Sequence, residues 1–187
     1  MILVDAVYIN NSGGKILLDY LIQQMEEADI EIYYLMDKRI EYNHPKIKIS
    51  NKVKYIKGGF IPRFMFYFKN AVKYKSIFCF GNFPPPIKQK VVVYSYFHNL
   101  LLINPPKNSS FIFDILTKLK ITLFSYLSKN SNYWIVQTSL MKKLLCNKFD
   151  NISENNVYVL PFFPTLILYS KINRVSNKFI YVSTGFK

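Results

Sequence analysis

Two polar side chains stand at the end of an apolar run in the middle of the chain. Residues 91–97 read VVVYSYF, a β-branched and aromatic pattern typical of a buried strand, and His98 and Asn99 follow directly. In open α/β sheets, ligands bind beyond the carboxyl ends of the strands, so His98 is a candidate site residue. The other histidine, His44, precedes Pro45 in a polar loop and indicates a surface position. A histidine after a buried strand can also be ordinary hydrogen-bonded structure, and that alternative stays open.

Two further turns carry groups that can bind a ligand. Gly13 and Gly14 lie between a first apolar run and a helical pattern, where close backbone approach and free N–H groups suit a phosphate or a sugar hydroxyl. The spacing matches neither the dinucleotide fingerprint nor the P-loop, and a tight turn alone would also explain the glycines. Thr138 follows another strand-like run and is either a binding group or an ordinary helix N-cap.

The elements that position these groups alternate along the chain. Apolar runs bounded by turn residues predict strands over 2–9, 30–36, 53–56, 76–80, 91–97, 133–137, 157–160 and 178–183. Helical patterns follow Gly14 and Pro62 and cover about 111–128 and 139–148. Continuous apolar strands alternating with helices predict an α/β, Rossmann-like, mainly parallel sheet with helices on both faces.

The length of 187 residues suits one well-buried domain, which we assign to residues 1–170. The polar and basic segment after it makes 171–187 a linker and one strand, too short to fold alone. Cys79 and Cys146 lie apart from both histidines, so a cysteine nucleophile or a metal site has little support, and both are expected to be reduced and buried.

The charge balance is strongly basic, with 25 Lys+Arg against 11 Asp+Glu and a formal net charge of +14. Such a field favours a polyanionic partner, which is nucleic acid, an anionic membrane surface or a phosphorylated small molecule. No signal-peptide pattern opens the sequence, and no apolar stretch approaches the roughly 20 residues that span a bilayer. We therefore expect a cytoplasmic protein that is soluble or peripheral on a membrane.

Four motifs occur in an order typical of one family: 11–14 (NSGG) before an apolar helix, 96–99 (YFHN), 134–138 (WIVQT) and 157–161 (VYVLP). Together they resemble the N-terminal, acceptor-side domain of family-4 glycosyltransferases of the GT-B fold. Residues 179–187 are similar to the opening strand and turn of the donor-binding domain of that family. The resemblance implies one half of a GT-B fold.

The resemblance also implies an activity: retaining transfer of a sugar from a nucleotide-sugar to a glycan or lipid-linked acceptor in polysaccharide assembly. It implies no obligatory metal and no cofactor besides the nucleotide-sugar co-substrate. His98 would be the catalytic residue facing the transferred sugar, and Gly13, Gly14, Asn99 and Thr138 would bind substrate. The family's Glu-x7-Glu pair would lie beyond residue 187, so we expect this chain alone to be inactive and to need a C-terminal domain or a complementing chain.

The predicted helix after Pro62 suggests a membrane contact. One stripe is expected to face the core; its members are Ile61, Phe64, Met65, Phe68, Ala71 and Val72. The opposite side mixes cations with aromatics and is expected to face an anionic bilayer at the inner face of the plasma membrane; its members are Arg63, Phe66, Tyr67, Lys73 and Tyr74. A helix packed on both sides is the alternative.

Two other functions remain as alternatives. A basic nucleic-acid-binding protein is compatible with the charge, but the basic residues are dispersed and no RNA-binding signature occurs, so no nucleic-acid partner is expected. A non-catalytic subunit of a glycosyltransferase assembly is the second alternative.

Overall fold

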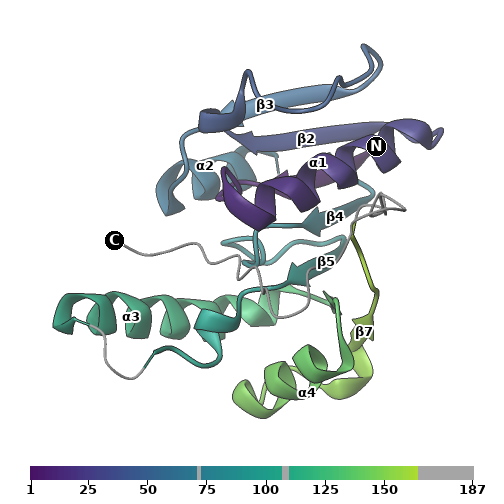
Figure 1. The fold of residues 1–187 in the computed structure, drawn as a ribbon. Helices are drawn as coiled ribbons and strands as arrows, with labels where there is room; N and C mark the ends of the chain where they lie inside the picture. The colour runs from purple at the N-terminus through teal and green to yellow at the C-terminus, as the bar shows by residue number, and fades with distance from the viewer. Residues whose placement is uncertain (71–72, 107–109, 164–187) are drawn as a thin grey trace, which may run out of the picture.

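Seven parallel strands form one sheet in the order β3-β2-β1-β4-β5-β6-β7 within the part of the chain that the structure describes (Figure 1). The structure is a computed structural model that describes residues 1–70, 73–106 and 110–163. The strands are β1 (Ile2–Ala6), β2 (Ile32–Asp37), β3 (Lys52–Ile56), β4 (Ser76–Cys79), β5 (Val92–Phe97), β6 (Tyr133–Val136) and β7 (Val157–Val159). Every neighbouring pair is parallel, as the continuous apolar runs predict.

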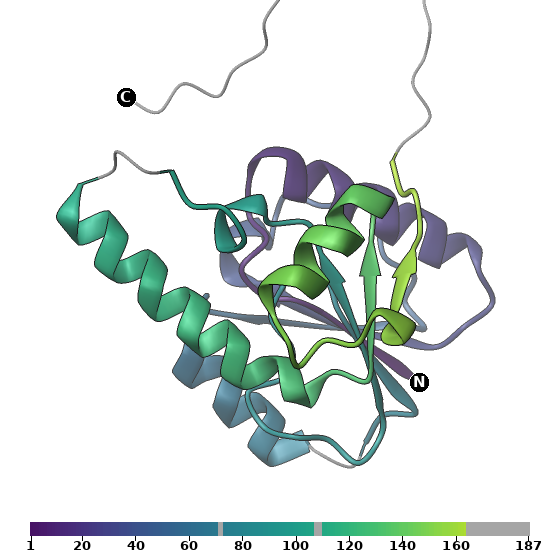
Figure 2. The same ribbon diagram turned by 90° about the horizontal axis from the view of Figure 1, so that it is seen from below.

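Helices cover both faces of this sheet. The four α-helices in the described residues are α1 (Ser12–Glu27), α2 (Phe60–Asn70), α3 (Phe111–Leu127) and α4 (Ser139–Lys148). Figure 2 shows α1 on one side of the sheet and α2 and α3 on the other. The predicted Rossmann-like architecture is confirmed, and the arrangement is consistent with half of a GT-B fold.

The core has one part on each face, because alternate strand residues point to opposite sides. On one face Val4 and Tyr34 pack with Leu18 and Ile22 of α1. On the other face α3 and α4 enclose Trp134, and α2 contributes its own cluster nearby. Packing on both faces fixes the strands, and with them the loops at the carboxyl ends of the strands, which we call the carboxyl edge of the sheet.

Helix α2 is rotated by half a turn from the orientation that its apolar stripe predicts. Arg63 is 2% exposed and Phe66 and Tyr67 are also buried, whereas Ile61 is 74% exposed and Phe68 is 67% exposed. The stripe therefore faces outward, and the prediction of a core-facing stripe is wrong.

The same rotation corrects the predicted membrane contact. Arg63, Phe66, Tyr67 and also Tyr74 are buried and cannot face a bilayer, while Lys73 is exposed. Ala71 and Val72 lie outside the described residues.

A buried ion pair explains this orientation of α2. The Arg63 Nε donates to Asp5 Oδ2 at 2.8 Å, and the other two nitrogens donate to the carbonyl oxygens of Pro84 at 2.8 Å and Phe83 at 2.7 Å. The Tyr67 hydroxyl also donates to Asp5 Oδ2, at 2.6 Å. Burial alone would lower the pKa of Arg63, but the Asp5 carboxylate raises it, so the guanidinium stays charged. Buried charges persist when they are paired and hydrogen-bonded in this way.

Several expectations concern parts of the chain beyond these contacts. The predicted boundary after residue 170 and the strand over 178–183 lie outside the described residues. Within the described ranges, no helix is both long and apolar enough to cross a bilayer. Both cysteines are free; Cys79 is buried, and Cys146 is only partly buried.

Candidate functional site

The candidate site lies where the chain changes direction across the sheet. After β1 the sheet grows to one side through β2 and β3, and β4 begins the other side. Ligands of open α/β sheets bind in the crevice at such a switch point, beyond the carboxyl ends of the strands. Gly14 follows β1, Asn82 follows β4 and His98 follows β5, so all three belong to this edge.

His98 is held by the loop that follows β4. Its backbone N–H donates to Asn82 Oδ1 at 2.8 Å, and Asn82 Nδ2 lies 3.5 Å from His98 Nε2. The imidazole packs on Tyr96 and Phe80, with ring centroids 5.3 Å and 6.0 Å away. Among the described residues, nothing hydrogen-bonds the buried Nδ1 atom. The ring is therefore fixed in position without all of its hydrogen-bonding capacity being used.

Burial lowers the pKa of His98 to about 4. The imidazole is neutral at pH 7 and offers one N–H donor and one acceptor nitrogen. A neutral ring suits a hydrogen bond with a hydroxyl group better than an ion pair with a phosphate. The structure thus supports a polar, uncharged contact at this position.

The first turn of α1 faces His98. A side chain at Gly14 would put its Cβ 3.6 Å from His98 Nε2, whereas a Cβ at Gly13 would meet nothing within 4 Å. The first N–H groups of a helix have no partner within the helix, and the side chain of Asn11 makes no capping hydrogen bond to them. The structure therefore brings Gly14 and His98 together beside the uncapped first turn of α1, and a side chain at Gly13 would enter open space.

Sequence reasoning missed two residues of this edge. Asn82 adopts a left-handed backbone conformation with φ 68°, which asparagine tolerates better than most residues. A Cβ at Gly81 would lie 2.5 Å from the carbonyl oxygen of Val7, so only glycine fits there. The segment 81–83 (GNF) after a predicted strand was the available signal, since glycine and asparagine mark special turns.

The other two predicted binding residues have structural roles. The Asn99 side chain accepts from the Leu101 N–H at 3.0 Å and so begins a short 3₁₀ turn. Thr138 accepts from the Met141 N–H at 3.1 Å and caps α4. Asn99 also lines a hollow of about 300 Å³ with Tyr8 and Phe83. No described contact joins Thr138 to His98.

Two of the other hollows in the described residues lie away from His98. One of about 320 Å³ is basic and lies beyond β2 and β3, lined by Asp37, Arg39, Lys57 and their neighbours. Burial alone would raise the pKa of Asp37, but hydrogen bonds from Arg39 lower it, so this carboxylate is already paired.

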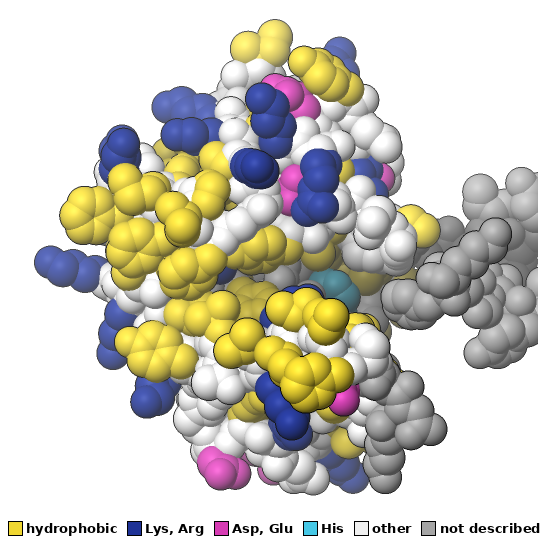
Figure 3. Space-filling model, turned by 90° about the vertical axis from the view of Figure 1, so that its left-hand side faces the viewer, with side chains coloured by type: hydrophobic (Ala, Val, Ile, Leu, Met, Phe, Trp, Pro, Cys, Tyr) yellow, Lys and Arg dark blue, Asp and Glu magenta, His cyan; other side chains and the backbone are white. Residues whose placement is uncertain are grey.

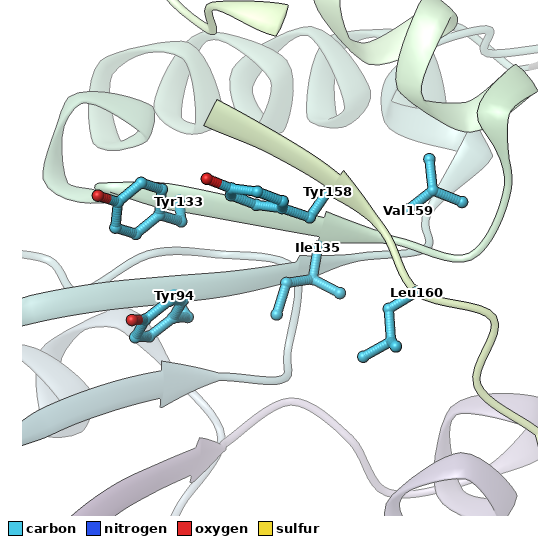
Figure 4. Close-up of a pocket in the computed structure, with 6 residues that line it drawn as sticks. All are labelled: Tyr94, Tyr133, Ile135, Tyr158, Val159 and Leu160. Atoms are coloured by element: carbon cyan, nitrogen blue, oxygen red, sulfur yellow. The ribbon is translucent and has the colours of Figure 1, made fainter. Parts of the chain in front are cut away.

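The other hollow measures about 500 Å³ and is lined by tyrosine and aliphatic side chains of β5, β6 and β7 (Figure 4). Tyr94 and Tyr133 stack there, with ring centroids 5.4 Å apart. Neither this hollow nor the basic one adjoins His98 in the described contacts.

Groups for other chemistries are not assembled in the described ranges. Burial raises the pKa of the Cys79 thiol to about 12, so it stays protonated and is a poor nucleophile. Within residues 1–70, 73–106 and 110–163, no three His, Cys, Asp or Glu side chains cluster closely enough to hold a metal ion.

Comparison with known proteins shows likeness of fold without likeness of sequence. No family model and no curated protein matches this sequence. Among solved structures, the wall teichoic acid polymerase TagF aligns with a TM-score of 0.51 and 10% identity, over 86% of this chain and 38% of that chain. A TagF variant soaked with CDPG aligns with a TM-score of 0.52 and 10% identity, over 86% and 39%. The chain thus spans less than two fifths of TagF, and the likeness is one of fold alone, consistent with half of a GT-B fold.

Proposed function

We propose that this chain is the acceptor-side lobe of a GT-B transferase that moves a sugar from a nucleotide-sugar to a glycan or lipid-linked acceptor. The observation that carries the proposal is the meeting of His98 with the uncapped first turn of α1 at the switch point of the sheet. A neutral imidazole and a row of N–H groups suit a ligand with both hydroxyl and phosphate oxygens. The fold of half a GT-B enzyme agrees with this assignment.

The proposal assigns a role to each group. His98 hydrogen-bonds a hydroxyl of the transferred sugar or of the acceptor, and Gly13 and Gly14 admit a phosphate or a sugar against the first turn of α1. Asn82 is a positioning residue, since it holds the backbone of His98. Retention of configuration, membership of family 4 and independence of metal are carried over from the sequence resemblance alone.

A transferase also needs groups that act on the nucleotide-sugar donor. Catalysis needs contacts that are realised in the transition state, and the expected glutamate pair for the leaving diphosphate is not among these residues. We therefore expect the 187 residues alone to give no product with UDP-, GDP- and CDP-linked donors. Turnover above an enzyme-free blank would contradict this expectation.

Ligand binding can be measured without turnover by following the histidine signals in NMR spectra, which are simple to assign because the chain has only two histidines. NMR would follow both imidazoles while UDP-glucose, GDP-mannose, CDP-glycerol and a short-chain polyprenyl diphosphate sugar are added in turn. The signals of His98 should shift with at least one of them, and His44, whose nitrogens contact the Pro45 carbonyl and the Tyr55 hydroxyl, should stay unchanged. A panel that leaves His98 unmoved would refute the proposed site.

Variants make the same test quantitative. His98→Ala should weaken binding of the active ligand about tenfold, as expected for the loss of one buried hydrogen bond, and His44→Ala should leave it unchanged. Equal affinity of His98→Ala and the parent chain would remove His98 from the site. Salt-sensitive binding of short oligonucleotides that also shifts His98 would instead favour the nucleic-acid alternative.

A further inference from the structure

Helix α3 is apolar on the side that faces away from the core. Thr117, Phe124 and Leu127 point inward and are buried. On the opposite side Ile112 is 71% exposed and Leu119 is 60% exposed, and Phe111, Ile115, Leu116 and Tyr126 are exposed with them. Large apolar side chains that gather in the open on one helix face are typical of a surface that a membrane or a partner molecule covers.

Helix α2 adds a second apolar face. Phe60, Phe64 and Phe68 follow one another at intervals of one helical turn, with successive ring centroids 6.3 Å and 6.2 Å apart. Ile61 and Met65 are exposed beside them. Phe64 and Phe68 of this row belong to the stripe that was expected to face the core, whereas Arg63 holds the other side of the helix inward.

The two faces belong to one surface. Phe60 of α2 and Leu123 and Leu127 of α3 line the same hollow of about 300 Å³, so the helices flank it from either side. Figure 3 shows hydrophobic side chains gathered over both helices around a recess, with lysine and arginine at the margins. We call this the α2/α3 surface, made of the exposed apolar residues of the two helices.

The charges around the α2/α3 surface are almost all positive. Lys118 and Lys120 are exposed on α3 and, at about 3.6 residues per turn, fall on either side of its apolar stripe. Lys69 lies on α2 and is also exposed. Asp114 is the one acidic residue of the sequence between Glu41 and Asp150.

We propose that the α2/α3 surface docks on an anionic lipid bilayer. Bulky apolar side chains that enter the interface, with lysines beside them for the headgroups, are the pattern of helices that lie in a membrane surface. A second copy of the chain would bring lysines against lysines, which disfavours association of two such faces. Nucleic acid would satisfy the lysines but leave the phenylalanine row without a partner.

Docking in this way places the candidate site next to the lipid. Asn99, the neighbour of His98, lines the hollow between α2 and α3. An acceptor anchored in the bilayer would therefore reach the carboxyl edge of the sheet from this side, a consequence that rests on the proposed function. The docking itself does not depend on it.

The test is co-sedimentation of the full chain with phosphatidylcholine vesicles and with vesicles that also contain phosphatidylglycerol. Only the anionic vesicles should pellet the chain, and added salt should release it. The double variant Ile61→Ser/Phe68→Ser should lower the partition coefficient about tenfold, since binding scales with buried apolar area. Its matched control is Ile16→Ser/Leu140→Ser, which changes two residues of similar exposure on α1 and α4, 60% and 65%, and should bind like the parent.

A charge variant keeps the proposal testable if the serine variants fold poorly. Lys118→Gln/Lys120→Gln should weaken binding to anionic vesicles severalfold, while Lys46→Gln/Lys48→Gln, which removes the same charge from an exposed loop, should have a smaller effect.

Three results would overturn the proposal. One is absence of the chain from the anionic pellet, and another is equal loss of binding in the α2/α3 variants and their controls. The third is a dimer in solution that Ile61→Ser/Phe68→Ser dissociates, which would assign the surface to a second copy. Normal shifts of His98 with a nucleotide-sugar in vesicle-free solution would show that the proposed function survives any of these.

Discussion

His98 lies in a pocket of aromatic rings that opposes its protonation. Its pKa is about 4 in the folded chain and 6.5 in the unfolded one, so between these values the unfolded chain binds the extra proton. Stability from this group is therefore complete above pH 6.5 and is lost as pH falls toward 4, by up to roughly 3 kcal/mol. Urea unfolding at pH 7.5 and 5 should show a smaller loss in His98→Gln than in the parent. His44→Gln is the control, and an identical loss in all three would contradict the assignment.

Two glycines near this histidine should respond oppositely to alanine. Gly81→Ala must displace the Val7 carbonyl, which would lie 2.5 Å from the new Cβ, and should cost roughly 1–3 kcal/mol. Gly13→Ala meets nothing within 4 Å and should raise the free energy of unfolding by a few tenths of a kcal/mol, because alanine favours the helix. Thermal unfolding of both variants checks the pair. Equal destabilisation would show that the space at Gly13 is not open.

At the scale of single residues, the sequence predicted the places of those candidate site residues that follow from strand ends. His98 was recognisable because a buried strand delivers it, and Gly13 and Gly14 because they open a helix. Asn82 was not recognisable, since its role depends on a left-handed backbone and a contact 16 residues away. The role of Thr138 as a helix cap was the ordinary alternative, and the structure has it, whereas the cap that Asn99 makes was not anticipated.

At the scale of elements, alternating apolar runs were a sufficient guide, because strands packed on both sides need them. The helix predicted over 139–148 is α4, with the same bounds. The orientation of α2 was not predictable from its own period. The partner that pulls Arg63 inward is Asp5, 58 positions earlier, and local hydrophobicity carries no information about it.

The Asp5–Arg63 pair gives a prediction for α2. Asp5→Asn or Arg63→Met alone should each lower the free energy of unfolding by about 3 kcal/mol or more, because each leaves one buried charge without its partner. The double variant should cost less than the sum of the two, and urea unfolding of the full cycle measures the coupling. Strict additivity would mean that the pair does not hold the helix.

The whole molecule carries a formal net charge of +14. Its positive side chains repel one another more strongly in the folded state than in an expanded one, because they lie closer together. Raising the salt from about 20 mM to about 300 mM should therefore raise the urea midpoint of unfolding, because screening weakens the repulsion. The same change should release the chain from anionic vesicles. A urea midpoint that falls or stays unchanged as salt is added would show that the charges are already balanced within the fold.

The buried ion pair between Asp5 of β1 and Arg63 of α2 also constrains how this sequence can diverge. A change at position 5 or 63 alone passes through a state with an uncompensated buried ion, so descendants should exchange both residues or neither. When relatives of this chain are collected, these two columns of the alignment should covary, and their joint replacement by an apolar pair would mark a branch in which the phenylalanine row on α2 is free to turn inward.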